Sequence, residues 1–438
     1  MRRTLDIEAS HNVALEASKL NVLLIAQYFP PDMGGGATRA YNVAKGLVIN
    51  GCTVTVIAAF PHYPTGNTPR SYRWKPFHLE ALKDMRVLRA FVPPVASEGL
   101  GKRLLTFFSF MISSLLVLPY VGQVDIIWAA NPNLLSIFPA SFYGLVKGKA
   151  VALNVDDLWP EGLDSAALVK ENSLFYRMTR FLARFAYSKA ELVTPISPGY
   201  TSVISRKYGT SPGRIHVVRA GVDLSKFSVV SSRRCSAQPT FKVIYCGAFS
   251  IAYDFEQVLL AASILGSRND VEIVLQGAGE LLNCVKLRVK KLALKNIKVI
   301  DKIVTREEVA KLLGEADALV LPLRDFGSPY PGVSSKLYEY QAMGKPILCC
   351  ANGQPAEYVE ETRSGIVISP GDYRSLAEAI VHLKEDPARA RTLGENGRDY
   401  VEKHVSIEEI GREMRELLFA TSARERIDNP IENPETSG

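Results

Sequence analysis

The sequence predicts an α/β protein made of two doubly wound domains that face each other across a cleft. The chain has 438 residues, more than one hydrophobic core ordinarily supports. Short apolar runs alternate with helix-length segments, a pattern typical of parallel strands joined by crossover helices. This alternation stops at the serine-rich residues 228–240, interpreted as a linker, and then starts again. Such sheets bind ligands beyond the carboxyl ends of their strands, so the site is expected in the cleft.

The first domain is expected over residues 20–227, after a loose N-terminal extension at 1–19. Its first apolar run, NVLLIAQYF, is followed by a glycine-rich turn and an amphipathic helix at 37–49. The expected strands are residues 21–29, 53–60, 124–130, 150–155 and 191–197.

The second domain is expected over residues 241–400, where the same alternation of strands and helices is repeated. A helix at 401–422 follows, with a return to the first domain as one possible course, and the polar tail 423–438 is expected to be disordered. The expected strands are 241–249, 271–277, 297–303, 318–323 and 345–351, and the expected helices are 254–266, 280–292, 306–315 and 334–343.

The composition is that of a globular protein, with 47% hydrophobic and 22% charged residues. The formal net charge of +7 favours an anionic partner, a class that includes phosphorylated metabolites, anionic lipids and nucleic acids. The six cysteines form no Cys-x-x-Cys pair, which indicates reduced packing residues and a cytosolic protein. The basic N-terminus lacks the apolar core of a secretory signal. No metal-ligand cluster is apparent, so no metal or cofactor is expected.

Residues 104–121 form an uncharged stretch, LLTFFSFMISSLLVLPYV, directly after Lys102 and Arg103. Eighteen apolar and small residues lie at the short limit of a membrane span, and the serines and Pro119 weaken that interpretation. A buried helix and a helix lying in the membrane interface on the cytosolic side are the other two interpretations.

Three glycines, Gly34, Gly35 and Gly36, separate the first expected strand from the first expected helix in YFPPDMGGGATRAYNVAKGL. Glycines let the backbone approach a ligand closely, and the free amides at a helix start favour an anion. The pattern therefore predicts contact with phosphate or acceptor, with a plain flexible turn as the alternative. The glycines of LQGAGE, at 275–280, form a similar strand-to-helix turn that is weaker evidence for a site.

The sequence DDLWPEG, at 156–162, follows an expected strand and so lies at its carboxyl end. Carboxylates accept hydrogen bonds from sugar hydroxyls, and an indole face packs on sugar C–H groups. We therefore predict an acceptor site that contains Asp156, Asp157, Trp159 and Glu161, with an exposed acidic loop as the alternative.

The sequence VSSKLYEYQAMGKPIL, at 333–348, predicts a helix that begins at Ser334 and Ser335 and ends at Gly344. Lys336 and Glu339 then share one helix face at spacing i, i+3. Serine hydroxyls, free amides and a lysine form an anion site, and a carboxylate one turn further on can accept hydrogen bonds from a ribose diol. The stretch thus predicts a pocket for a nucleoside diphosphate. A surface ion pair is the alternative.

These residues resemble the retaining, nucleotide-sugar-dependent glycosyltransferases of the GT-B fold, in the group 1 class. Within that class they are most similar to the bacterial surface-polysaccharide branch, which includes O-antigen and colanic acid enzymes and related amino-sugar transferases. The resemblance covers roughly residues 20–420. It rests on YFPPDMGGGATR, DDLWPE, SPG at 197–199, HVVRAGVD at 216–223, SSKLYEYQAMGKPI and GIVISPGD.

The resemblance implies specific roles for several residues. Glu339 would bind the donor ribose, and Gly35 and Gly36 would approach the donor phosphates and the transferred sugar. It also implies a front-face reaction without a protein nucleophile, in which a cation holds the leaving diphosphate. The full expected donor site is Gly35, Gly36, Gly247, Gly277, Arg324, Ser334, Ser335, Lys336 and Glu339, and Lys336, Glu339 and Asp157 are the expected catalytic residues.

The sequence departs from the common family pattern at three places. Many relatives carry a second glutamate eight residues before the one at Glu339, where this chain has Pro331. Many carry a basic pair after the first strand of the second domain, where this chain has Ala248 and Tyr253, so Lys336, or secondly Arg324, is expected to replace it. Asn131 stands where many relatives have a histidine and is added to the expected acceptor site.

The expected function is transfer of a hexosyl or N-acetylhexosaminyl group from a nucleotide sugar, UDP-linked in the first instance, to a lipid-linked or saccharide acceptor. A polyprenyl-diphosphate-linked acceptor would bring the enzyme to the inner face of the cell membrane, through Lys102, Arg103 and residues 104–121. No nucleic acid partner is expected. The alternatives are a UDP-sugar 2-epimerase, a non-catalytic partner in a polysaccharide assembly complex, and an NAD-dependent dehydrogenase, which lacks its dinucleotide fingerprint here.

Overall fold

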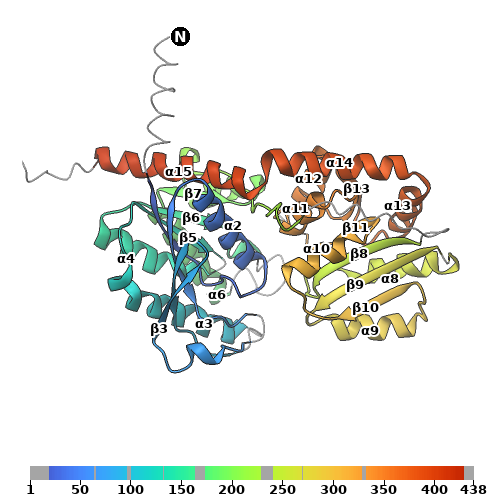
Figure 1. Cartoon of the computed structure of the whole chain (residues 1–438), viewed down its shortest axis with the longest axis horizontal. Helices are drawn as coiled ribbons and strands as arrows, with labels where there is room; N and C mark the ends of the chain where they lie inside the picture. Colours follow the sequence, from blue (N-terminus) through green and yellow to red (C-terminus); the bar gives the residue numbers. More distant parts are fainter. Residues whose placement is uncertain are drawn as a thin grey trace, which may run out of the picture. The chain divides into compact units, whose positions relative to one another are not determined.

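The protein is described by a computed structural model that covers residues 19–63, 66–95, 100–131, 133–162, 173–227, 240–268, 270–327 and 332–428. The chain divides into two compact units, one made of residues 1–220 and 407–438 and the other of residues 221–406. Each unit is an α/β layer structure built on one sheet, as the alternation of apolar runs predicts (Figure 1). The expected linker lies outside the described residues except for Thr240.

The first unit contains a seven-stranded sheet in the order β3-β4-β2-β1-β5-β6-β7. All neighbouring strands are parallel except β3 and β4, which form an antiparallel hairpin at the edge that the sequence pattern did not predict. The interior strands β5 and β6 are buried along their whole length, as expected for a sheet covered on both faces. The strands are β1 (Asn21–Ile25), β2 (Thr53–Ala59), β3 (Phe77–Leu82), β4 (Met85–Ala90), β5 (Ile126–Asn131), β6 (Val151–Val155) and β7 (Leu192–Pro195).

The helices of the first unit connect these strands and close the core. α2 begins at Gly35 and ends at Ile49, close to the expected helix. α4 and α7 each end at a left-handed glycine, Gly148 and Gly209, which stops the helix and turns the chain. The helices are α2 (Gly35–Ile49), α3 (Leu100–Ser113), α4 (Ile137–Lys147), α6 (Leu174–Lys189), α7 (Pro198–Tyr208) and α15 (Ile407–Asp428), with short 3₁₀ turns that include η2 (Ser114–Tyr120) and η3 (Leu134–Ser136).

The second unit contains a six-stranded parallel sheet in the order β10-β9-β8-β11-β12-β13. The strands are β8 (Phe241–Ala248), β9 (Val271–Ala278), β10 (Ile297–Asp301), β11 (Ala318–Pro322), β12 (Ile347–Cys350) and β13 (Gly365–Ile368). The helices are α8 (Phe255–Ile264), α9 (Leu282–Lys291), α10 (Arg306–Gly314), α11 (Ser335–Ala342), α12 (Gln354–Glu361), α13 (Tyr373–Glu385) and α14 (Pro387–His404). Five of its strands and its first four helices coincide with expected elements, and β13 is the sixth strand that was not predicted.

Each sheet has one point where the strand order reverses, and there ligands of doubly wound sheets bind. In the first sheet this point lies between β1 and β5, and in the second between β8 and β11. The glycine-rich turn follows β1, and Asn131 ends β5. Gly247 lies near the end of β8, and Arg324 follows β11. The topology of each unit therefore brings expected site residues to its own switch point.

The last helix, α15, packs on α2 in the first unit, and two glycines make this contact possible (Figure 1). A Cβ atom at Gly46 would overlap the Ile407 carbonyl and come within 2.9 Å of the Gly411 Cα. A Cβ at Gly411 would in turn overlap the Gly46 backbone. Three residues of α15, Ile410, Met414 and Leu418, join the core of the first unit. The chain therefore completes its first unit with its last helix, which starts at Ile407 rather than at the expected residue 401.

The uncharged stretch at 104–121 forms most of α3 together with η2. Within residues 101–120 lies the one helical segment of the described residues that is long and apolar enough to cross a membrane, and 33% of its most apolar window is buried. Phe107 and Phe110 are buried, whereas Leu105, Ile112 and Leu116 are more than half exposed. The segment therefore packs one side against the core and exposes apolar side chains on the other.

The close packing of α15 on α2 predicts that Gly411→Ala lowers the stability of the first unit. The added methyl group meets backbone atoms that cannot rotate away, and such overpacking costs about 1–3 kcal/mol. A fall of several degrees in melting temperature is expected. The matched control is Gly213→Ala in the same unit, where the nearest atom to a Cβ lies 4.0 Å away. Equal melting temperatures for both variants would contradict the packing argument.

Candidate active site

The helix α11 starts at the residues that the sequence indicated. Ser334 is its N-cap, and its Oγ accepts a hydrogen bond from the Lys336 amide at 3.4 Å. Ser335 is the first helical residue, and both serines are half-buried. The helix ends at Ala342, and Gly344 follows in a left-handed conformation (φ 63°). The predicted boundaries of this helix are therefore confirmed.

The Lys336 side chain fills a notch that exists because residue 247 is a glycine. A Cβ at Gly247 would overlap the Lys336 amine and lie 2.6 Å from its Cε, and its φ of 153° also favours glycine. The amine lies 6.0 Å from the centre of the Tyr245 ring, within cation–π range. Burial opposes the charge, but nearby Tyr253 and Glu339 outweigh it, so the pKa of Lys336 is raised and the residue is a cation at neutral pH.

Glu339, one turn further along α11, is 7% exposed and pairs with Arg306. The Arg306 Nη1 lies 2.7 Å from the Glu339 Oε1, and its guanidinium carbon lies 5.2 Å from the centre of the Phe227 ring. Sequence reasoning missed Arg306, which is the first residue of α10. No local pattern links residues 306 and 339, because only the fold brings α10 beside α11.

Cys246 shows that the three charged groups share one neighbourhood. Burial raises the pKa of its thiol to about 11, and Lys336, Glu339 and Arg306 all act on it electrostatically. Two cations and one carboxylate thus surround the end of β8. This neighbourhood carries a net positive charge, which suits an anionic group.

The other expected donor residues of the second unit have more varied surroundings. Gly277 lies opposite Gly247 in the β8–β9 pair, and a Cβ at Gly277 would overlap the Gly247 carbonyl. The close approach of two strands therefore accounts for this glycine. Arg324 is exposed after β11, and its side chain donates to the Tyr253 carbonyl at 3.5 Å.

In the first unit, a buried arginine organises the carboxyl end of β6. The Arg39 Nε lies 3.0 Å from the Asp156 Oδ1, and Arg39 also donates to the Asn154 Oδ1 and, at 2.7 Å, to the Val218 carbonyl. Asn154 donates to the same Asp156 oxygen at 2.8 Å. Burial raises the pKa of Asp156 to about 7, although Arg39 and Asn154 act against this rise. Sequence reasoning missed Arg39, since nothing in the pattern of α2 distinguishes it from a solvent-exposed arginine.

The remaining acceptor residues differ in how far their side chains are already engaged. Asp157 is exposed to solvent but crowded by protein atoms, which raises its pKa. Asn131 is 1% exposed and donates to the Asp157 carbonyl at 3.3 Å. The Trp159 ring lies 6.4 Å from the Phe107 ring of α3. Glu161 accepts from the Tyr208 hydroxyl at 3.0 Å and pairs with Lys207 at 3.5 Å, so these contacts hold it in the fold.

The turn before α2 contains a buried carboxylate, Asp32, that the sequence analysis did not single out. The Asp32 Oδ1 accepts from the amides of His62 and Tyr63 at 2.8 and 2.9 Å, and its Oδ2 lies 3.6 Å from the His62 Nδ1. Burial raises the pKa of Asp32. These bonds fix the turn before α2, which starts at Gly35, and a Cβ at Gly35 would meet no atom within 4 Å. The helix start is therefore open at Gly35.

Each unit thus presents one chemically distinct set of groups at its switch point. The second unit holds a half-buried lysine cation and a paired glutamate beside a serine-capped helix start. The first unit holds an exposed carboxylate, an indole and an open helix start. Among the described residues, no group of three or more His, Cys, Asp or Glu side chains could hold a metal ion.

Two family profiles match the chain, one in each unit. Residues 235–400 match the family described as "Glycosyl transferases group 1", and residues 33–226 match "Glycosyltransferase Family 4". The chain belongs to the group 1 glycosyltransferases of the GT-B fold. The resemblance drawn from the α11 stretch is therefore confirmed at the level of family and fold.

The curated relatives of this group 1 chain differ in substrate. It is 24% identical over 242 residues to a GDP-mannose-dependent mannosyltransferase of Corynebacterium glutamicum that acts on a monoacylated phosphatidylinositol monomannoside, covering 53% of this chain and 62% of that protein. It is 25% identical over 242 residues to WcaL of Escherichia coli, a candidate colanic acid biosynthesis glycosyltransferase, covering 53% and 58%. The chain spans about three fifths of the length of these relatives.

Solved structures agree with the GT-B fold. Sucrose-phosphate synthase from Thermosynechococcus elongatus superposes with a TM-score of 0.72 at 19% identity, covering 93% of this chain and all of that one. HepE of Anabaena, solved in complex with UDP, superposes with a TM-score of 0.63 at 14% identity, covering 92% and 100%. At these identities the likeness shows the fold alone.

The Arg39–Asp156 pair predicts a stability loss that grows with pH when Arg39 is replaced. Without Arg39, the pKa of Asp156 rises further above its ordinary value, so the folded state keeps a proton that the unfolded state loses. The natural sequence loses stability in the same way up to about pH 7, the pKa of folded Asp156, so the extra loss of Arg39→Met should grow above about pH 7, by about 1.4 kcal/mol for each further pH unit. The full loss is about 3–5 kcal/mol where the carboxylate is charged.

Melting temperatures at pH 5 and pH 8 check this prediction. Relative to the natural sequence at the same pH, the melting temperature of the variant should fall further at pH 8 than at pH 5. Arg206→Met, an exposed arginine on α7, is the matched control and should change little at either pH. Equal losses of Arg39→Met at the two pH values would show that Asp156 does not carry the effect.

Proposed function

We propose that this protein is a retaining glycosyltransferase that moves a sugar from a nucleoside-diphosphate sugar to a lipid-linked or saccharide acceptor in surface polysaccharide synthesis. The observation that carries the proposal is the Lys336 amine, held as a cation in the Gly247 notch beside the start of α11. A cation at the carboxyl ends of the strands, where doubly wound sheets bind ligands, attracts an anion. A diphosphate supplies that anion.

The donor is assigned to the second unit. Lys336 and the free amides at the start of α11, with Ser334 and Ser335, face the charge of the diphosphate. The pair with Arg306 uses the Glu339 Oε1, and we assign Oε2 to the ribose diol. Arg324 is the second cation assigned to the diphosphate.

The reaction requires little of the protein beyond this electrostatic work. The bond between the anomeric carbon and the diphosphate oxygen breaks, and the acceptor oxygen bonds to the same face of that carbon. The acceptor proton passes to an oxygen of the leaving diphosphate, so atoms and charge balance without a protein nucleophile. Lys336 stabilises the charge that develops on the diphosphate, which is the main catalytic demand.

The acceptor is assigned to the first unit. Asp157 is the carboxylate whose side chain reaches solvent, and Trp159 offers an indole face to a sugar ring. Asp156 is held by Arg39 and Asn154, so its role is to fix the loop. Gly35, with open space around it, allows the transferred sugar to approach the start of α2.

We propose a UDP-linked donor, a hexose or an N-acetylhexosamine, and a site of action at the cytoplasmic face of the membrane. Support for UDP is the HepE structure, which was solved in complex with UDP. The Corynebacterium glutamicum relative, by contrast, depends on GDP-mannose, so GDP sugars are the decisive competitors in any screen. Support for a surface-polysaccharide role is the likeness to WcaL.

A thermal-shift screen of UDP- and GDP-sugars tests the donor assignment. A ligand at about 100 times its dissociation constant stabilises the folded state by about 2.7 kcal/mol and raises the melting temperature. UDP sugars should give the larger shift. If the protein binds no nucleotide sugar, the result would instead support the alternative of a non-catalytic partner in an assembly complex.

Substitution of Lys336 is expected to weaken nucleotide binding by about ten- to a hundredfold, because a charge-assisted contact of about 1.5–3 kcal/mol is lost. Lys336→Met keeps the side-chain bulk in the Gly247 notch, and calorimetry with UDP measures the effect. Glu339→Gln should weaken the binding of UDP and UDP-sugars but leave the binding of inorganic diphosphate unchanged, since we assign Glu339 to the ribose. Lys291→Met, an exposed lysine at the end of α9, is the control.

Product analysis separates transfer from epimerisation. A transferase releases the nucleotide faster when an acceptor is added and forms a product with the donor's anomeric configuration. A 2-epimerase releases a free epimer without any acceptor. Nucleotide release that is independent of every acceptor, together with an epimerised sugar, would replace the transferase proposal.

A further inference from the structure

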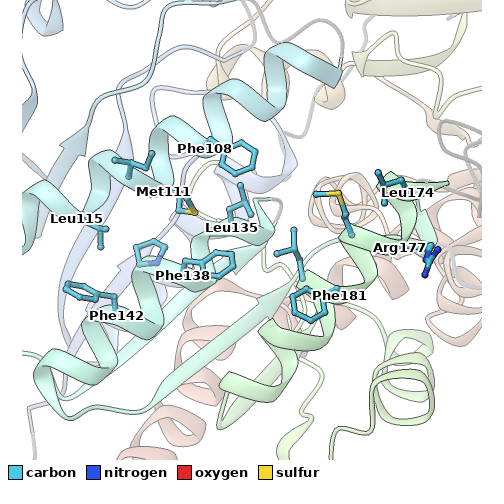
Figure 2. A pocket seen from close by; sticks show the side chains of 13 residues that line it. Phe108, Met111, Leu115, Leu135, Phe138, Phe142, Leu174, Arg177 and Phe181 are labelled. Atoms are coloured by element: carbon cyan, nitrogen blue, oxygen red, sulfur yellow. The ribbon is translucent and has the colours of Figure 1, made fainter.

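An apolar groove lies on the first unit, lined mainly by the helices α3, α4 and α6. It has a volume of about 950 Å³ and is lined by 13 residues from α3, η2, η3, α4 and α6, of which Arg177 alone is charged (Figure 2). Leu115 and Phe142 lie toward one end, and Leu174 and Arg177 lie at the other. The volume is at the upper end of the range of about 300–1,000 Å³ that small-molecule sites occupy.

The walls of the groove expose far more apolar surface than scattered surface residues do. Ile112 on α3 is 61% exposed, and Leu174 and Phe181 on α6 are 73% and 70% exposed. Contiguous apolar surface of this kind marks a site for another molecule, because leaving it in water is unfavourable. The groove therefore requires an apolar occupant.

The charges around the groove indicate what that occupant carries. The elements α3, η2, α4 and α6 contain no Asp or Glu, whereas basic residues recur on them. These basic residues are Lys102, Arg103, Lys147, Arg177, Arg180, Arg184 and Lys189. Cations without carboxylates on these four described elements complement a molecule with a hydrocarbon part and an anionic group.

One helix connects the groove with the loop that we assign to the acceptor. On α3, Phe108 lines the groove, and its neighbour Phe107 is buried and lies 6.4 Å from the Trp159 ring. The Phe107 carbonyl also accepts from Asn133, just before η3, at 3.5 Å. The groove and the acceptor loop thus contact adjacent sides of one short segment of α3.

We propose that this groove binds the hydrocarbon chain of a lipid phosphate, the lipid part of the acceptor, with Arg177 at the phosphate. The proposal rests on the proposed function, since it takes the acceptor to be lipid-linked. A single linear hydrocarbon chain fits a groove whose walls are apolar, and Arg177 at one end of the groove fits the phosphate at the end of that chain. The lipid then brings its sugar to the side of α3 that carries Trp159.

Calorimetry with the full chain and dodecyl phosphate, kept below its micelle concentration, tests the proposal. Dodecyl trimethylammonium has the same chain and a cationic head, and glycerol 3-phosphate has the phosphate without the chain. We expect saturable binding of dodecyl phosphate with about 1:1 stoichiometry, binding at least about tenfold weaker for the ammonium, and none for glycerol 3-phosphate. Equal binding of the two long-chain molecules, or no binding of dodecyl phosphate, would overturn the proposal.

Exposed residues on the two walls provide the variants. Ile112→Glu and Phe181→Glu place a carboxylate in the groove. Each should weaken the binding of dodecyl phosphate by about tenfold or more. Leu145→Glu is the matched control, because Leu145 on α4 is 82% exposed but does not line the groove. If Leu145→Glu weakened binding as much as Phe181→Glu, the whole apolar face rather than the groove would bind, and the proposal would be wrong.

The head-group assignment has its own pair of variants on α6. Arg177→Gln should weaken the binding of dodecyl phosphate by about tenfold. Arg180 is an exposed arginine outside the groove, so Arg180→Gln should leave this binding unchanged. Equal effects would mean that diffuse charge, not Arg177, meets the phosphate.

The nucleotide assays keep this proposal separate from the proposed function. Phe181→Glu should bind UDP as the natural sequence does, which also shows that it is folded. Transfer to a water-soluble acceptor without any binding of dodecyl phosphate would overturn the groove assignment and leave the transferase intact. Binding of dodecyl phosphate without any binding of a nucleotide sugar would leave the lipid groove and overturn the transferase.

Discussion

The contact on which the second unit's chemistry depends is that of the Lys336 amine with the backbone at Gly247. Only a residue without a Cβ leaves room for the amine there, and the positive φ of Gly247 is open to glycine at little strain. The Tyr245 ring below and Glu339 beside it keep the amine charged in a crowded place. The arrangement holds a full positive charge ready before any ligand arrives, and this preorganisation makes such a charge effective in a reaction.

Much of the fold could be predicted from the sequence because buried parallel strands read as short apolar runs, and β5, β8 and β11 do so. The hairpin of β3 and β4 could not. β3, FHLEAL, lies at a sheet edge, half-buried and exposed by turns, so its pattern resembles a loop. The short β13 has no fully buried residue before Ile368, and the same reasoning applies to it.

The candidate site divides in the same way. Lys336 and Glu339 could be predicted together because they lie one turn apart on one helix, a local relation. Arg306 and Arg39 could not, since each meets its carboxylate across a long stretch of chain: Arg306 reaches Glu339 from α10, and Arg39 reaches Asp156 from α2. The sequence does not distinguish a buried arginine from an exposed one, because the difference lies in the tertiary contacts. The structure thus adds the partners of the charged groups that sequence reasoning named.

These partners separate the two neighbouring aspartates, which the sequence pattern treats alike. Asp156 accepts from Arg39 and Asn154, and both bonds stabilise its charged form against the effect of burial. Removing its charge would leave the buried Arg39 guanidinium without this carboxylate, so Asp156 serves the fold. The Asp157 side chain reaches solvent, crowding by protein atoms raises its pKa, and no arginine of the described residues offsets this rise. A carboxylate that reaches solvent can accept a hydrogen bond from an incoming hydroxyl, whereas the Asp156 carboxylate is already engaged by Arg39 and Asn154, and for this reason we place the acceptor at Asp157.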